Sequence, residues 1–221
     1  MKKDRKELDV TKDKEKLKSL FEINSLDNLI KNHFCYEMKN FYKNPDEICN
    51  LLNKKPLHIH KWGEKNSLNT VDFIDCRHAF ISEDFKKTEK KIYDFLKKDS
   101  TEIEGRVITN FTKFFNIKDD FKNNYWWPHI DSPPYSYNCI IYLNKDSCDG
   151  TNIYVKLKHD ENDREAEHSH PWQNKNKYRL LQNIKSEYNK LVIFRANIYH
   201  GLAYNEHRFK NKFRKNQVIF V

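Results

Sequence analysis

The second half of the chain, after Thr101, consists of short strand-like segments, and this pattern constrains the fold more than any other feature. β-Branched and aromatic residues dominate these segments, which are RVITNFTKFF (106–115), NCIIYLN (138–144), TNIYVKL (151–157), LVIFRANIY (191–199) and QVIFV (217–221). Short strands separated by polar loops are typical of antiparallel sandwiches and barrels. We therefore expect a mainly β or α+β protein, with a β core over residues 101–221 and helices packed outside it.

The first hundred residues carry helical patterns. Apolar residues recur at helical spacing over residues 21–52, and NPDEICNLL places a proline at a first helical position with acids behind it. These signals predict a helix from Pro45 to about Asn53. A second helix is predicted in SEDFKKTEKKIYDFLKKD, residues 82–99. Its apolar face carries Phe85, Ile92 and Phe95.

One domain is expected over residues 21–221, with helical support at 21–100 and the β core at 101–221. The 15 Phe, 12 Tyr and 4 Trp supply enough large side chains for one full core. Residues 1–20 alternate lysine with acids and read as a charged tail or solvated helix. The polar stretch 158–177, KHDENDREAEHSHPWQNKNK, is too long for an ordinary hairpin, so it is either a functional lid or disordered.

Charge and cysteine content limit the expected partners and compartment. The formal net charge is +9, but the lysines are scattered among asparagines, as coding bias would scatter them, so binding to nucleic acid is allowed but not favoured. The five cysteines form no CxxC pair and are odd in number, which argues against a disulfide framework and fits a reducing compartment. No signal-peptide pattern or membrane-length apolar run is present, so we expect a soluble cytoplasmic protein with no membrane partner.

The segment WWPHIDSPPYSYNCIIYLNKD, residues 126–146, is an apolar and aromatic island that contains one His-x-Asp step, His129 and Asp131. In a strand, residues i and i+2 point to the same face, so this step would place an imidazole nitrogen beside a carboxylate oxygen. Both atoms are ligands for a divalent metal. Because the chain has 10 His, one such step also arises by chance, and the spacing alone does not establish a site.

A third metal ligand is available in His200, at the end of the apolar segment LVIFRANIYH. Gly201 follows it, where the backbone would pass close to a bound group. Taken alone, such a histidine is more commonly a packed, hydrogen-bonded residue. Together with His129 and Asp131 it completes a two-histidine, one-carboxylate triad, which leaves metal positions open and is typical of non-haem Fe(II) oxygenases.

The segment HIDSPPYSYNCIIYLNKD resembles the corresponding part of the prolyl-hydroxylase type of Fe(II)/2-oxoglutarate-dependent dioxygenases. That family carries an HxD step, a cysteine-bearing strand and a Tyr-Leu-Asn turn at similar spacing. The similarity continues to GTNIY and FRANIYHG, covers roughly residues 104–221, and extends loosely to NFYKNPDEICNLL. It implies a double-stranded β-helix, or jelly roll, with N-terminal helices outside and Fe(II) held by His129, Asp131 and His200.

The same resemblance implies a binding place for the co-substrate 2-oxoglutarate. In the family, an arginine on the last strand holds its far carboxylate with help from a tyrosine, and Tyr142 and Arg214 match these positions. A guanidinium binds a carboxylate through two parallel hydrogen bonds. The gap from His200 to Arg214 is longer than usual in the family, so Arg208 and Lys212 remain alternatives, and all three could instead belong to a solvated basic loop.

The implied reaction uses O2 and converts 2-oxoglutarate into succinate and CO2 while an unidentified substrate, a small molecule or a protein side chain, is hydroxylated. Trp127, Tyr135 and Tyr137 flank the proposed ligands and are candidate substrate contacts, although sheet packing explains them equally well. Two alternatives stay open. One is a non-catalytic, cupin-like jelly roll that binds metal or nucleic acid, and the other is a cupin-like isomerase or an oxygenase that does not use 2-oxoglutarate.

Other histidine pairs compete as metal ligands. His159 and Glu161 lie in the polar stretch, where no strand fixes their directions, and His168 and His170 lie there too. The pair His58 and His60 in LHIHKW reads as one face of a short strand. None of these pairs has an evident third and fourth ligand, so they are weaker candidates for a zinc site.

Overall fold

The computed structural model describes residues 22–54, 58–62, 71–75, 83–99, 108–115, 122–146, 150–157, 172–203 and 214–221. Predictions that lie outside these residues are those for the tail at 1–20, for most of the polar stretch (158–171), and for His159, Glu161, His168, His170, Arg208 and Lys212. Within the described ranges, no helix has the length and apolar character needed to cross a membrane.

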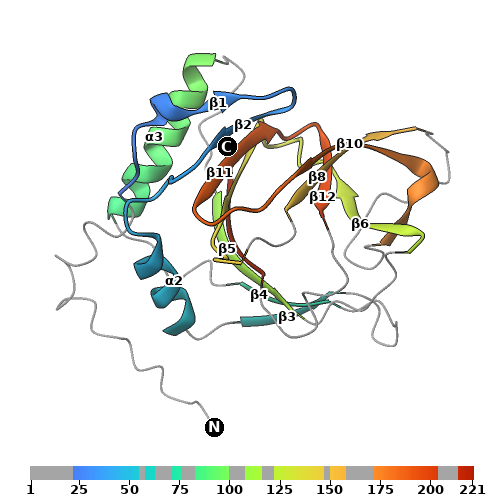
Figure 1. Ribbon diagram of the computed structural model, residues 1–221, viewed down its shortest axis with the longest axis horizontal. Coiled ribbons are helices and arrows are strands. Elements are labelled where there is room, and N and C mark those ends of the chain that lie inside the picture. Colours follow the sequence, from blue (N-terminus) through green and yellow to red (C-terminus); the bar gives the residue numbers. More distant parts are fainter. Residues whose placement is uncertain are drawn as a thin grey trace, which may run out of the picture.

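Two antiparallel sheets dominate the described chain (Figure 1). The larger sheet consists, in spatial order, of β1 (Ile30–Lys31), β2 (Cys35–Met38), β11 (Lys190–Arg195), β7 (Tyr137–Tyr142), β13 (Arg214–Phe220), β5 (Ile108–Phe115), β4 (Val71–Asp75) and β3 (His58–Trp62). The smaller sheet consists of β10 (Tyr178–Ile184), β8 (Thr151–Lys156), β12 (Tyr199–Leu202), β6 (Asn124–His129) and β9 (Trp172–Asn174). Short 3₁₀ turns, η1 (Leu26–Asn28) and η2 (Lys175–Lys177), accompany them.

The strands are connected as in a double-stranded β-helix. The central strands of the two sheets follow the orders β11-β7-β13-β5 and β10-β8-β12-β6. Along the chain from β5 to β8 and again from β10 to β13, each successive core strand lies in the opposite sheet. The strands β8 and β10 pair directly within the smaller sheet. This mainly β jelly-roll core confirms the predicted fold class.

The helices cover the outer face of the larger sheet. The predicted helices are confirmed as α2 (Pro45–Lys54) and α3 (Glu83–Asp99), which lie on the side away from the smaller sheet (Figure 1). Ile92 and Leu96 of α3 are fully buried against that face. The larger sheet is therefore covered on both sides, which explains why its central strands are almost continuously apolar.

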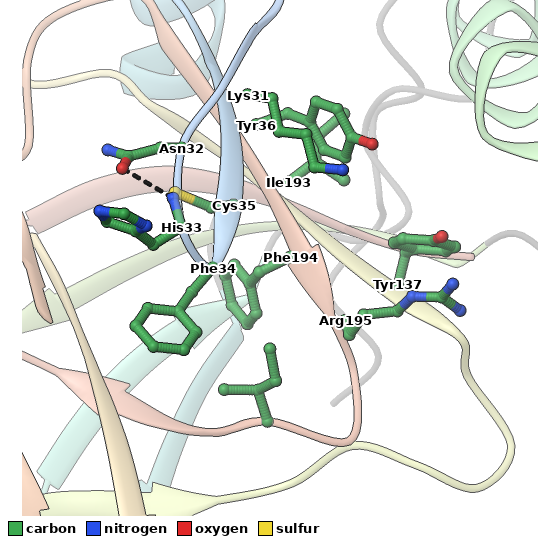
Figure 2. A pocket seen from close by; sticks show the side chains of 11 residues that line it. Lys31, Asn32, His33, Phe34, Cys35, Tyr36, Tyr137, Ile193, Phe194 and Arg195 are labelled. Carbon is green, nitrogen blue, oxygen red and sulfur yellow. Dashed lines mark hydrogen bonds between the residues drawn. The ribbon is translucent and has the colours of Figure 1, made fainter. Parts of the chain in front are cut away.

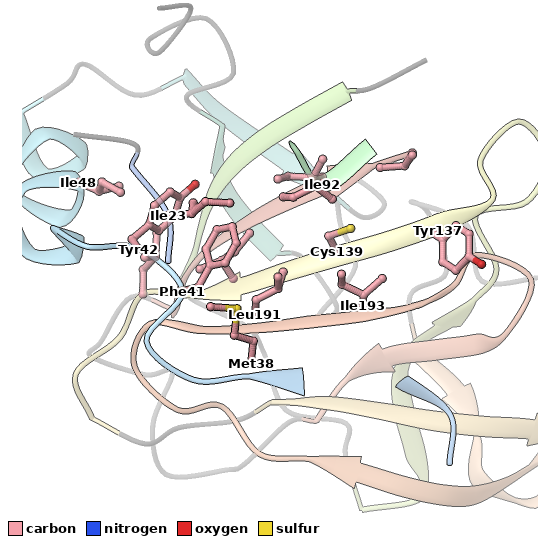
Figure 3. Packing of buried hydrophobic residues seen from close by; sticks show 14 of the residues in the cluster. Ile23, Met38, Phe41, Tyr42, Ile48, Ile92, Tyr137, Cys139, Leu191 and Ile193 are labelled. Carbon is pink, nitrogen blue, oxygen red and sulfur yellow. The ribbon is translucent and has the colours of Figure 1, made fainter. Parts of the chain in front are cut away.

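Strand β7 shows how the two sides differ. Its odd-numbered residues, including Cys139 and Ile141, pack into the outer cluster with α3, as Figure 3 shows. Its even-numbered residues Ile140 and Tyr142 pack into the inner cluster with Ile153 of β8. Because side chains alternate along a strand, the inner face of β7 is the wall of the jelly-roll interior.

Two predictions about local structure were wrong. The helical spacing of residues 21–52 is misleading before Pro45, because Cys35–Met38 forms β2 and pairs with β11. The segment LVIFRANIY is two strands, since β11 ends at Arg195 and β12 begins at Tyr199 in the other sheet. The pair His58 and His60 does lie on a short strand, β3, as predicted.

Candidate metal centre

The three predicted ligands meet where β6 and β12 lie side by side. His129 is the last residue of β6, and its backbone neighbour across the sheet is His200 of β12. Their rings are 4.3 Å apart between centroids. Asp131 lies beyond the end of β6, in the β6–β7 loop, so the His-x-Asp step is not inside a strand as expected. A hydrogen bond of 2.9 Å from the Asp131 N–H to the Ala196 carbonyl holds this loop against the β11–β12 turn.

The side chains of this triad converge on one point. The Asp131 Oδ1 lies 3.5 Å from the His129 Nε2, and the Asp131 Oδ2 lies 3.2 Å from the His200 Nε2. One ligand atom from each of the three residues lies within 4.8 Å of the others, a spacing that could hold a metal ion. His200 is buried, and the other two ligands are only partly exposed. Among the described residues, these three form the group of histidine, cysteine and acidic side chains whose ligand atoms lie close enough together to hold a metal ion.

Backbone carbonyls fix which nitrogen of each imidazole faces inward. The His129 Nδ1 lies 2.7 Å from the Trp127 carbonyl, and the His200 Nδ1 lies 3.0 Å from the Ile198 carbonyl. Because a carbonyl oxygen only accepts, each Nδ1 must carry the hydrogen, and in a neutral ring the Nε2 then presents its lone pair. Both lone pairs face the Asp131 carboxylate, which is also an acceptor. Such a set of acceptors is satisfied by a cation between them.

The protonation states suit a divalent metal. Burial, followed by the electrostatic influence of His200, lowers the pKa of His129 to about 4. Burial alone would raise the pKa of Asp131, but its contacts with His200, His129 and Asn138 outweigh burial and lower it. At neutral pH His129 is therefore neutral and Asp131 ionised, which are the forms that bind metal.

A bulge in β6 places the carbonyl that orients His129. Trp127 has a positive φ of 49°, and the pairing between β6 and β12 slips by one residue between His200 and Leu202. A Cβ on Gly201 would lie 2.5 Å from the Trp126 carbonyl oxygen and 2.8 Å from that of Trp127. The backbone at Gly201 was expected to pass close to a bound group, but the neighbour that it approaches closely is the backbone of β6.

Replacing Gly201 with alanine is expected to destabilise the protein by about 1–3 kcal/mol, because the added methyl group overpacks a rigid backbone contact. The displaced Trp127 carbonyl would also release the His129 ring, so affinity for Co(II) should fall. Thermal unfolding and Co(II) titration measure the two effects separately. Unchanged melting temperature and Co(II) affinity would show that β6 yields freely at this point.

The two residues predicted to bind 2-oxoglutarate lie together in the jelly-roll interior. Arg214 of β13 places its guanidinium carbon 5.7 Å from the centroid of the Tyr142 ring, and both residues are buried. The Arg214 Nη2 donates a hydrogen bond of 3.2 Å to the Gly150 carbonyl. The Tyr142 hydroxyl lies 2.8 Å from the Thr151 Oγ1. Burial raises the pKa of Tyr142 to about 12 against the opposing charge of Arg214, so the phenol keeps its proton and can donate it.

Sequence reasoning missed two polar residues of this interior, Asn138 and Thr151. The Asn138 Nδ2 donates a hydrogen bond of 2.7 Å to the Asp131 Oδ2. The signal was present, because Asn138 is a polar residue in an apolar strand and lies at even spacing from Tyr142. Thr151 follows Gly150 in the segment GTNIY and contacts Tyr142 directly.

The three candidate substrate contacts lie at different distances from the triad. Trp127 lies beside the triad, with its ring perpendicular to that of His129 at a centroid distance of 6.0 Å. Tyr135 is half-buried and packs against the Phe220 ring at 4.9 Å. Tyr137 belongs to the outer cluster and lies under the Arg195 guanidinium at 4.5 Å, on the face of β7 opposite to the triad. The structure thus brings Trp127 to the metal ligands and leaves Tyr137 away from them.

A pocket of about 430 Å³ lies between the β1–β2 hairpin and the end of β11, and Tyr137 is among the residues that line it (Figure 2). Its wall includes Phe194, whose ring centroid is 4.7 Å from that of His200. Ile198, which supplies the carbonyl for His200, also lines it. The remaining wall is largely aromatic and basic, with Lys31, His33, Phe34, Tyr36 and Arg195 among its members. Two residues that line this pocket, Phe194 and Ile198, therefore contact His200.

No model of a known protein family matches the chain, and no curated protein matches it in sequence. Solved structures do match. The epimerase SnoN in complex with Fe3+, alpha ketoglutarate and nogalamycin RO superposes with a TM-score of 0.52 at 12% identity, covering 94% of this chain and 82% of SnoN. A second SnoN structure is described as a non-heme alpha ketoglutarate dependent epimerase from nogalamycin biosynthesis. It has a TM-score of 0.51 at 11% identity, covering 94% of this chain and 80% of SnoN.

A prolyl-4-hydroxylase from Pseudomonas putida also matches, with a TM-score of 0.46 at 10% identity and coverage of 86% of this chain and 92% of that one. The fold assignment depends on the SnoN structures, whose scores are higher. The chain has the double-stranded β-helix fold of the 2-oxoglutarate and Fe(II) oxygenases, which confirms the resemblance at the level of fold.

Proposed function

We propose that this protein is an Fe(II)- and 2-oxoglutarate-dependent oxygenase that hydroxylates a substrate still to be identified. The observation that carries the proposal is the convergence of the His129 Nε2, the His200 Nε2 and the Asp131 carboxylate, with both Nδ1 atoms engaged by backbone carbonyls. Two imidazoles and one carboxylate are the ligand set of non-haem Fe(II) oxygenases.

The residues present fit an iron ion. They supply two imidazole nitrogens and one ionised oxygen, which leaves room for further ligands on a metal that prefers six. Bound there, Fe(II) with 2-oxoglutarate and O2 would supply oxidation of an unreactive C–H bond, with succinate and CO2 as co-products. The chain itself orients the imidazoles and keeps Asp131 ionised.

The deeper interior fits the far carboxylate of 2-oxoglutarate. Arg214 offers a fixed positive charge, and the hydrogen bond to Gly150 limits its motion. The protonated Tyr142 hydroxyl offers a second donor, with Thr151 beside it. A cation and a phenol in this buried interior would bind a carboxylate strongly, since little water competes for either group.

We propose hydroxylation as the outcome of the reaction, with one alternative. Two solved structures that share the fold at a TM-score above 0.5 are of an epimerase, so inversion of a stereocentre is a second candidate outcome for the same metal site. Trp127, beside the triad, is the proposed substrate contact. We propose a small molecule or a protein side chain as the substrate class.

Conversion of 2-oxoglutarate into succinate tests the proposed function. The full chain loaded with Fe(II) should release succinate slowly without substrate, and faster with a true substrate found in a screen of metabolites and peptides. The same protein loaded with Zn(II) should release none. Absence of succinate under all conditions, with tight Zn(II) binding, would favour a non-catalytic metal-binding protein.

A further inference from the structure

Asn138 occupies a place in the jelly roll where an apolar residue would pack more easily. Its direct neighbours across the sheet are Phe194 of β11 and Phe220 of β13. Only 1% of the residue is exposed to solvent. Burying an amide between two aromatic neighbours is unfavourable unless its hydrogen bonds are made.

The two ends of this amide differ sharply in their contacts. The Nδ2 donates to the Asp131 Oδ2 at 2.7 Å and lies 3.4 Å from the His200 Nε2. Because an ionised carboxylate only accepts, the NH2 end must face Asp131, and the orientation of the amide is fixed. The Asn138 Oδ1 is buried and has no hydrogen-bond partner among the residues that the structure describes.

We propose that Asn138 is a positioning residue for the metal centre, which engages one oxygen of Asp131 and leaves the other for the metal. The hydrogen bond uses one of the two lone pairs of Oδ2, so Oδ1, which lies 3.5 Å from the His129 Nε2, keeps more acceptor capacity for the metal. A carboxylate that binds through one oxygen fills one metal position, and two co-substrates need the remaining ones. This inference rests on the proposed function, because it concerns the same metal site.

The unpaired Oδ1 has a role in the same arrangement. A buried acceptor without a partner lowers stability, so an occupant of the site that satisfies it stabilises the bound state. We expect the Asn138 Oδ1 to accept a hydrogen bond from a proton-bearing group that enters with the metal, such as a water molecule. Asn138 would then hold Asp131 with one end of its amide and an occupant of the site with the other.

The test uses Co(II), whose visible spectrum reports the number and geometry of its ligands, added to the full chain without 2-oxoglutarate. The variants are Asn138→Leu, which keeps the branching at Cγ but removes the amide, and Asn138→Ser, which is too short to reach Asp131. The matched control is Ile140→Val, on the same face of β7 and two residues farther along. Both Asn138 variants should weaken Co(II) binding about 10- to 100-fold and change the spectrum. Ile140→Val should do neither.

Thermal unfolding of the metal-free proteins separates positioning from folding. Asn138→Leu should unfold at the same temperature as the wild type or higher, because it removes an unsatisfied polar atom. If either folded Asn138 variant binds Co(II) within twofold of the wild type and with the same spectrum, the inference is overturned. If the wild type itself binds no Co(II), the proposed function fails, and this inference fails with it.

Discussion

Replacing His200 with alanine should abolish metal binding at micromolar concentrations. Loss of a residue that only supports a metal ligand lowers metal affinity about 10- to 100-fold. Because His200 is a direct ligand in the proposed centre, its loss should lower metal affinity further. The change also leaves the Asp131 carboxylate with one imidazole in a partly buried site. Titration with Fe(II) under anaerobic conditions, or with Co(II), measures the effect.

The control for this experiment is His33→Ala, which removes an exposed histidine from the β1–β2 hairpin. It should leave metal affinity unchanged. His200→Ala must also keep the jelly roll folded, which circular dichroism and thermal unfolding can verify. A folded His200→Ala protein that binds Fe(II) as tightly as the wild type would show that the metal lies elsewhere.

Replacing Arg214 with leucine should weaken the binding of 2-oxoglutarate by at least about 30-fold while leaving metal affinity unchanged. The estimate follows from losing charge-assisted hydrogen bonds, each contributing about 1.5–3 kcal/mol in a buried setting. Leucine places no charge in the buried interior, and after the substitution the Gly150 carbonyl still accepts a hydrogen bond from the Ala203 N–H. Isothermal titration of the metal-loaded protein with 2-oxoglutarate measures the change.

This experiment also decides among the basic residues before the last strand. Arg214 is buried beside Tyr142, where the far carboxylate of 2-oxoglutarate is proposed to bind. Arg208→Leu and Lys212→Leu should therefore bind 2-oxoglutarate as the wild type does. If one of them weakens 2-oxoglutarate binding and Arg214→Leu does not, the anchor has been assigned to the wrong residue.

The β core could be predicted from the sequence because its strands are short, aromatic and β-branched. What failed was the separation of β11 from β12. Their shared segment is apolar except for Arg195 and Asn197, and the turn at Ala196 contains no glycine or proline to mark it. Strand β2 was missed for a different reason, since its pairing with β11 is a contact between residues far apart in the sequence.

The candidate site, like the fold, could be predicted from the sequence only in part. His129, Asp131 and His200 were found through residue type, spacing and family resemblance, and the fold brings them together. The bulge at Trp127 and the close approach to Gly201 depend on how β6 and β12 pair, which no local pattern encodes. Asn138 carried a readable signal, a polar residue on an inward-facing position, but its partner Asp131 became evident only from the three-dimensional structure.

The most direct measurement of the central claim is the visible spectrum of the full chain with Fe(II) and 2-oxoglutarate under anaerobic conditions. Chelation of the metal by 2-oxoglutarate at the proposed triad should produce a weak charge-transfer band, and His129→Ala should abolish it. The band should also disappear when Zn(II) replaces Fe(II). A wild-type protein that shows no band while binding Zn(II) tightly would contradict the assignment of this site as an Fe(II) and 2-oxoglutarate centre.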